Sequence, residues 1–142
     1  MALERTSSAR WEGDLKEGRG QLDVGNGRYS APYNFVSRFE SGDEINPEEL
    51  IAAAHAACYS MALSGDLARG GHTPERVVTD ATVSFDPGGP RITTIHLTVR
   101  GRVPDIDAET FQTFAEGAKQ NCPVSKALAS VDEITLDATL ES

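Results

Sequence analysis

The sequence predicts an α+β fold with mainly antiparallel sheets and two long central helices. Apolar and polar residues alternate in several short segments, a pattern typical of strands with one buried face. Two longer segments, one at residues 46–69 and one beginning at Asp107, instead carry apolar residues at helical spacing. The order is strands, helix, strand hairpin, helix and final strand, which favours the α+β class.

Residues 10–29 are predicted to form short strands joined by tight turns. Trp11 with Leu15 and Leu22 with Val24 are short apolar patterns, and glycines punctuate them. Such punctuation is typical of turns between strands. Residues 33–39 are predicted to be a further extended segment.

Residues 46–69 are the clearest predicted helix. Asn46 suits the N-cap, Pro47 the first helical position and Glu49 the third position of a capping box. The segment is rich in alanine and apolar nearly all round, so we expect it to be buried on every side. Because a chain with one other long helix offers limited cover, we expect a second subunit to supply the rest.

A long hairpin is predicted next. Residues 77–85 and 95–99 alternate apolar and polar side chains around a Pro- and Gly-rich turn. Asp107 is predicted to cap the second helix, which Pro123 interrupts and restarts as a short helix. Residues 134–140 alternate strictly and predict a last strand.

The composition indicates a single soluble domain over residues 1–142. Hydrophobic residues make up 39% of the chain and charged residues 25%, which is typical of a globular domain. Thirteen Lys and Arg against 22 Asp and Glu give a net charge of −9. We therefore expect no nucleic-acid partner and no binding to an anionic membrane, because both require basic patches.

The N-terminal residues lack the apolar core of a signal peptide, and the longest apolar run, residues 50–63, is too short to span a bilayer. We expect a cytoplasmic protein. Thiols are kept reduced there, so a permanent disulfide is not expected. The two cysteines, Cys58 and Cys122, need another explanation.

Cys58 lies in the middle of the first predicted helix and Cys122 directly before a predicted helix start. A free cysteine is often only a small core residue. A helix N-terminus, however, stabilises a thiolate and lowers its pKa. If the two cysteines meet when the helices pack, a transient catalytic pair or a metal site is favoured over a structural disulfide.

The metal alternative would use His55 and Cys58, which share one helix face, with Cys122 as a third ligand. Zinc requires four such ligands, or three and a water, and the other two histidines give no sign of converging on them. There is also no glycine-rich phosphate loop and no nucleophile-elbow motif. We expect no metal and no other cofactor, and we interpret His55 as a satisfied core histidine.

Two motifs resemble the OsmC/Ohr family of osmotically inducible and organic hydroperoxide resistance proteins. Residues 46–63, NPEELIAAAHAACYSMAL, are similar to its signature helix, and residues 119–125, KQNCPVS, to its second cysteine motif. Residues 11–16 and 38–40 resemble the OsmC branch rather than the Ohr branch. The similarity covers nearly the whole chain.

The resemblance implies an intertwined homodimer with active sites at the subunit interface. It implies a cysteine-based peroxidase that reduces organic hydroperoxides and, in the OsmC branch, hydrogen peroxide. By motif, Cys58 takes the role of the peroxidatic cysteine and Cys122 that of the resolving one, while Arg38 matches the arginine that activates the thiolate and Glu48 the glutamate that pairs with it. Dithiols, such as lipoyl groups on proteins, are the expected reductants.

The chemistry of Cys58 requires a positive charge beside it. Burial in mid-helix would raise its pKa, whereas a charge-assisted bond from Arg38 would contribute about 1.5–3 kcal/mol, or roughly one to two pKa units. Glu48 precedes Cys58 by ten positions on one helix, which is about 15 Å. Either Arg38 spans this gap or a Glu48 of the partner subunit is used, and we expect each site to mix residues from both subunits.

Without the resemblance, Arg38 would be interpreted as a surface arginine after a strand. Glu48 and Glu49 would be first-turn residues facing water. Four further apolar side chains are expected either to line a mouth for an alkyl hydroperoxide or to be core residues: Phe39, Tyr59, Met61 and Phe111.

The alternative function belongs to another class. An acidic, non-enzymatic module could bind a small ligand or sense redox state, with the same cysteine pair as its switch. Both hypotheses predict a reversible disulfide, so catalytic turnover is the property that distinguishes them.

Overall fold

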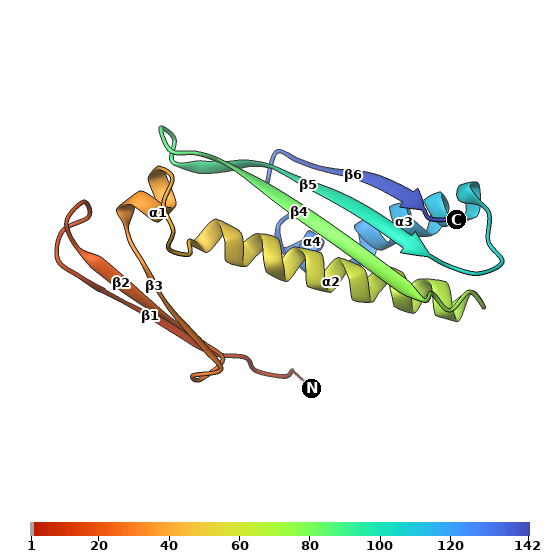
Figure 1. Ribbon diagram of the computed structural model, residues 1–142, viewed down its shortest axis with the longest axis horizontal. Coiled ribbons are helices and arrows are strands. Elements are labelled where there is room, and N and C mark those ends of the chain that lie inside the picture. The colour runs from red at the N-terminus through yellow and green to blue at the C-terminus, as the bar shows by residue number, and fades with distance from the viewer. Residues whose placement is uncertain (1) are drawn as a thin grey trace. The chain divides into compact units, whose positions relative to one another are not determined.

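Three short strands open the chain and pair in sequence order to form an antiparallel sheet (Figure 1). They are β1 (Ser7–Glu12), β2 (Arg19–Val24) and β3 (Tyr29–Tyr33). Gly25, Asn26 and Gly27 all have positive φ in the turn between β2 and β3, a conformation that glycine and asparagine adopt most readily. The predicted short strands and tight turns are thus confirmed.

The computed structural model describes residues 2–142, and these form two compact units. The first ends at Glu49 and the second is Leu50–Ser142. The prediction of one domain over residues 1–142 stays a prediction. No helix among residues 2–142 is long and apolar enough to cross a membrane.

The prediction of an extended segment at residues 33–39 holds for Tyr33 and Asn34 and is wrong from Phe35 onward, because Phe35–Phe39 forms the short helix α1. A capping box starts it. The Asn34 side chain accepts a hydrogen bond from the Ser37 backbone N–H at 2.8 Å, and the Asn34 N–H donates to the Ser37 hydroxyl at 3.1 Å. These bonds satisfy backbone donors that a strand edge would have left to solvent.

Helix α2 (Pro47–Arg69) begins and ends as the sequence predicts. Asn46 and Glu49 form a reciprocal capping box with bonds of 2.8 and 3.2 Å. Beyond Arg69, Gly71 has a φ of 89°, and the N–H of His72 donates back to the Leu67 carbonyl at 2.8 Å. This is the left-handed helix end that glycine permits.

Burial of α2 on every side is not observed in the single chain. One stripe, at positions four apart, is fully buried: His55, Tyr59, Leu63 and Leu67. The opposite stripe is exposed and consists of small or apolar residues: Ala53, Ala54, Ala57 and Met61. A single copy therefore leaves uncovered a helix face that carries no charge.

The second sheet joins β4 (Arg76–Asp86), β5 (Arg91–Arg102) and β6 (Glu133–Leu140) in that order. β4 and β5 form the predicted antiparallel hairpin, whereas β5 and β6 are parallel. Helices α3 (Ala108–Asn121) and α4 (Pro123–Ala127) lie between them in the chain. A helical crossover of this length is what a parallel pair requires.

Helices α2 and α3 pack against one face of this sheet, the face that carries alternate residues of β5 (Figure 1). These are Ile95, Leu97 and Val99, all without solvent exposure. The core continues into α3 through Phe111, Ala115 and Ala118. The predicted α+β architecture, with mainly antiparallel strands and two long helices, is confirmed.

Candidate active site

The two cysteines lie in contact inside the second unit. The Sγ atoms of Cys58 and Cys122 are 3.1 Å apart, although the residues are separated by 64 positions in the chain. Both are free thiols, Cys122 buried and Cys58 partly exposed. Because a disulfide holds its sulfurs about 2.05 Å apart, a small motion would join them.

Cys122 is fixed by the junction of two helices. It ends α3, where its N–H donates to the Ala118 carbonyl at 2.9 Å, and it precedes α4, where its own carbonyl accepts from Lys126 at 3.1 Å. Pro123 occupies the first position of α4, where its missing N–H costs nothing. The helix break predicted at Pro123 thus places the Cys122 thiol in the interior of the second unit.

Cys58 is positioned by its neighbours on α2. The Tyr59 hydroxyl donates to the backbone carbonyl of Ala115 on α3 at 2.8 Å, and the Ser60 hydroxyl donates to the side-chain hydroxyl of Thr79 on β4 at 2.8 Å. These two bonds fix the rotation of the helix about its axis. As a result Cys58 faces the junction that holds Cys122.

The surroundings shift the pKa values of the two thiols in opposite directions. Burial raises the pKa of Cys58, and the neighbouring Cys122 adds to the rise. Burial opposes ionisation of Cys122 as well, but hydrogen bonds from Cys58, from the Ser125 N–H and hydroxyl, and from the Val124 N–H lower its pKa overall. Such donors stabilise a thiolate. These surroundings therefore favour a thiolate at Cys122 over one at Cys58.

Arg38 and Glu48 form a two-pronged ion pair in the first unit. The Arg38 Nε donates to Glu48 Oε1 at 3.3 Å, and its Nη2 donates to Oε2 at 3.2 Å. Glu48 is buried, so the interpretation of it as a residue facing water is wrong, whereas Glu49 does serve as a cap. The guanidinium carbon lies 5.4 Å from the Phe39 ring centroid.

His55 makes one of its two possible hydrogen bonds. Its Nε2 lies 2.6 Å from the Ser125 Oγ, and its Nδ1 has no partner among residues 2–142 although the residue is fully buried. The prediction of a satisfied core histidine is therefore only half right. Ser125 also acts to lower the pKa of the Cys122 thiol, so sequence reasoning missed a functional neighbour. The only available signal was its place three residues after Cys122.

The remaining candidates divide between core and surface. Tyr59 and Phe111 are fully buried core residues, whereas Met61 is 77% exposed. In the described part of the chain, residues 2–142, no group of three or more His, Cys, Asp or Glu side chains is arranged to hold a metal ion.

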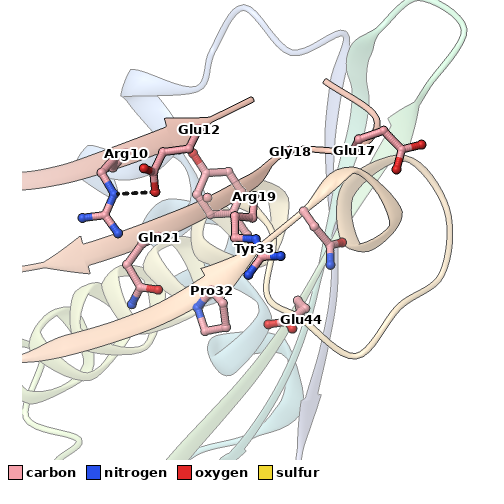
Figure 2. A pocket seen from close by; sticks show the side chains of 11 residues that line it. Arg10, Glu12, Glu17, Gly18, Arg19, Gln21, Pro32, Tyr33 and Glu44 are labelled. Carbon is pink, nitrogen blue, oxygen red and sulfur yellow. Dashed lines mark ion pairs between the residues drawn. The ribbon is translucent and has the colours of Figure 1, made fainter. Parts of the chain in front are cut away.

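A separate pocket of about 370 Å³ lies in the first unit, between β1, β2 and β3 (Figure 2). Its walls carry charges of both signs, and Arg10 and Glu12 pair across 3.3 Å. Neither a thiol nor an imidazole lines it. Thiol chemistry therefore belongs to the cysteine pair and not to this pocket.

A partly exposed thiol on a long helix, facing a second thiol at a helix junction under a three-stranded sheet, defines an α+β dithiol protein. The sequence profile of the OsmC-like protein family matches residues 40–137. The chain belongs to this family.

Relatives extend over the full chain. Peroxiredoxin OsmC of Escherichia coli (strain K12) is 47% identical over 100% of both chains. The organic hydroperoxide resistance protein of Xanthomonas axonopodis pv. citri (strain 306) is 36% identical over 67% of each. The crystal structure of an OsmC-like protein from Mycoplasma pneumoniae covers both chains completely with a TM-score of 0.74 at 16% identity, and so shares the fold.

Proposed function

We propose that this protein is a thiol-dependent peroxidase that reduces organic hydroperoxides and hydrogen peroxide. The observation that carries the proposal is the 3.1 Å contact between Cys58 and Cys122. A thiol that becomes oxidised at Cys58 has its partner already in place. The names peroxiredoxin and organic hydroperoxide resistance protein, borne by relatives, support the same reaction class.

The catalytic cycle has three balanced steps. The Cys58 thiolate attacks the peroxide O–O bond, which breaks to leave a sulfenic acid on Cys58 and an alcohol, or water from hydrogen peroxide, after proton uptake. The Cys122 thiolate then attacks the sulfenic sulfur, forming the disulfide and releasing hydroxide, which is protonated to water. An external dithiol reduces the disulfide by exchange and is itself oxidised.

Arg38 is proposed to activate Cys58, and Glu48 to hold Arg38. Because burial raises the pKa of Cys58, its thiolate needs a positive charge, and a guanidinium stays charged at every working pH. The bidentate bonds from Glu48 fix the plane of the guanidinium. In this role Arg38 would also donate to a peroxide oxygen.

The proposed assembly is a homodimer with sites that mix residues of both subunits. The homodimer is supported by the uncharged exposed stripe of α2, which includes Ala57 and Met61. Covering such a face with another surface lowers the free energy. The proposed reductant is a dithiol such as a lipoyl group on a protein. Between turnovers both thiols must be reduced, which fits a cytoplasmic location.

The test is turnover in a mixture of the protein, a dithiol and cumene hydroperoxide. We expect continuous loss of peroxide with the native protein and none with Cys58→Ser. The Cys122→Ser variant should accumulate sulfenic or more highly oxidised Cys58, detected by mass spectrometry. A wild-type rate in Cys58→Ser would refute the peroxidase. Formation of one disulfide per chain without turnover would favour the non-enzymatic redox module instead.

A further inference from the structure

A buried histidine is hydrogen-bonded to a serine that follows Cys122 by three positions on α4. His55 on α2 and Ser125 on α4 are 70 positions apart in the chain, yet the Nε2 of the ring and the serine Oγ are 2.6 Å apart. Cys122 is the N-cap of α4 and Ser125 its third residue, and the Ser125 hydroxyl acts to lower the pKa of the Cys122 thiol. Ser125 is 6% exposed and His55 is not exposed at all. The catalytic cycle proposed above does not use His55.

The unpartnered ring nitrogen fixes the direction of these bonds. The Nδ1 of His55 is buried and has no partner in the part of the chain that the structure describes, and a buried N–H without an acceptor is rarer and more costly than a bare lone pair. Burial also lowers the pKa of His55, which keeps the ring neutral. The single ring proton therefore belongs on Nε2, from which it donates to the Ser125 oxygen.

A hydroxyl that accepts from the imidazole directs its own single proton elsewhere. The sulfur of Cys122, which caps the helix that carries Ser125, is an acceptor for it. We propose that His55 is a positioning residue for the resolving thiolate, holding the Ser125 hydroxyl so that it donates to the Cys122 sulfur. This inference rests on the proposed function in one respect only, the assignment of Cys122 as the resolving cysteine.

In the second step of the cycle the Cys122 thiolate is the nucleophile that displaces hydroxide from the Cys58 sulfenic acid. The chain of bonds raises the population of that thiolate without itself gaining or losing a proton. Other groups that bear on the Cys122 sulfur are the Cys58 thiol of α2 and the N–H groups of Val124 and Ser125. The charge of a Cys122 thiolate also raises the pKa of the Tyr59 phenol, whose hydroxyl donates to the Ala115 carbonyl.

The experiment measures the titration of Cys122 alone. In a Cys58→Ala background, the ultraviolet absorbance of the thiolate is followed against pH. We expect Ser125→Ala and His55→Phe each to move the midpoint upward by about one pH unit, the effect of losing one hydrogen bond to a charged group. His55→Gln, whose amide N–H can donate in place of Nε2, should recover part of the shift.

Non-additivity separates a chain of bonds from two independent effects. Because His55 acts through Ser125, adding His55→Phe to Ser125→Ala should move the midpoint no further. The matched control is Ser30→Ala, which also removes a serine hydroxyl bond, to Asp23 in the first unit, and should leave the midpoint unchanged. Circular dichroism verifies that each variant is folded.

An unchanged midpoint in Ser125→Ala, an unchanged midpoint in both His55 variants, or additive shifts would overturn the inference. If His55→Phe does not fold, the Ser125→Ala and His55→Gln measurements decide. The titration requires neither peroxide nor turnover. A protein that fails the peroxidase assay can therefore still pass this test, and one that passes the assay can fail it.

Discussion

At the scale of single residues, the pKa shifts of the two thiols are opposite to those that their assigned roles suggest. Donors surround Cys122 and lower its pKa, whereas burial raises that of Cys58, the cysteine assigned to attack peroxide. A nucleophile in such surroundings needs help from a charge. For this reason we expect the Arg38–Glu48 pair, which is bidentate and partly buried, to stabilise the Cys58 thiolate.

Replacing Arg38 should therefore change ionisation as well as rate. In a Cys122→Ser background, Arg38→Met should shift the pH profile of Cys58 alkylation by iodoacetamide upward by roughly one to two units, since a charge-assisted bond contributes about 1.5–3 kcal/mol. In the native background the same substitution should lower peroxidase activity near neutral pH by roughly 10- to 100-fold.

Two variants sharpen this prediction. Glu48→Gln should produce a smaller shift in the same direction, because the guanidinium keeps its charge and loses only its fixed orientation. Arg10→Met removes another paired arginine of the first unit, one bound to Glu12, and should change neither quantity. An alkylation profile of Arg38→Met that coincides with that of Arg10→Met would exclude the proposed role of Arg38.

The site residues differ in how far the sequence alone could identify them. Cys58 and Cys122 stand in recognisable motifs, and the pairing of Arg38 with Glu48 followed from the same resemblance. The Ser125 contact could not be predicted, because it depends on α4 packing against α2 across 70 positions. Local patterns carry no information on which side chains meet over such a separation.

At the scale of elements, the strands and long helices were predictable because each has its own periodicity and end signals. Residues 33–39 were predicted as extended because apolar character alone does not separate a short helix from a strand. The Asn34–Ser37 capping box decided between them. The parallel pairing of β5 and β6 could not be predicted either, since alternation along one strand does not reveal its neighbour.

The close approach of β5 and α3 gives a prediction about stability. A Cβ added at Gly101 on β5 would lie 2.5 Å from the Cε1 of Phe111 on α3, and both residues are buried. Because the core there is closely packed, Gly101→Ala should lower the free energy of unfolding by about 1–3 kcal/mol. The urea midpoint of unfolding measures this loss.

Gly117→Ala is the matched control for this substitution. It introduces the same methyl group into α3, where nothing lies within 4 Å of the new Cβ. Alanine is favoured over glycine within a helix, so Gly117→Ala should raise the free energy of unfolding by about 0.5–1 kcal/mol. Equal effects of the two substitutions would contradict the close packing of Gly101 against Phe111.

At the scale of the whole molecule, the composition of α2 supports the proposed homodimer. Its buried stripe faces the second sheet. Its exposed stripe consists of small and apolar residues that are typical of a protein core, although they are exposed in the single chain. The predicted burial of α2 on every side is not observed in the single chain, because this stripe is exposed. Helix backbones approach closely where side chains are small, so a second copy of α2 would fit the alanines well.

The exposed stripe can be tested by adding charge to it. Met61 is 77% exposed, so a solvated glutamate there should cost a monomer almost nothing, whereas burying that charge against a partner would be strongly unfavourable. We expect sedimentation to give a dimer for the native chain and for Met61→Leu, a volume-conserving change. Met61→Glu and Ala57→Glu should both be folded monomers by sedimentation and circular dichroism. If both charged variants remain dimers, the partner binds elsewhere and the uncovered face of α2 is not the subunit interface.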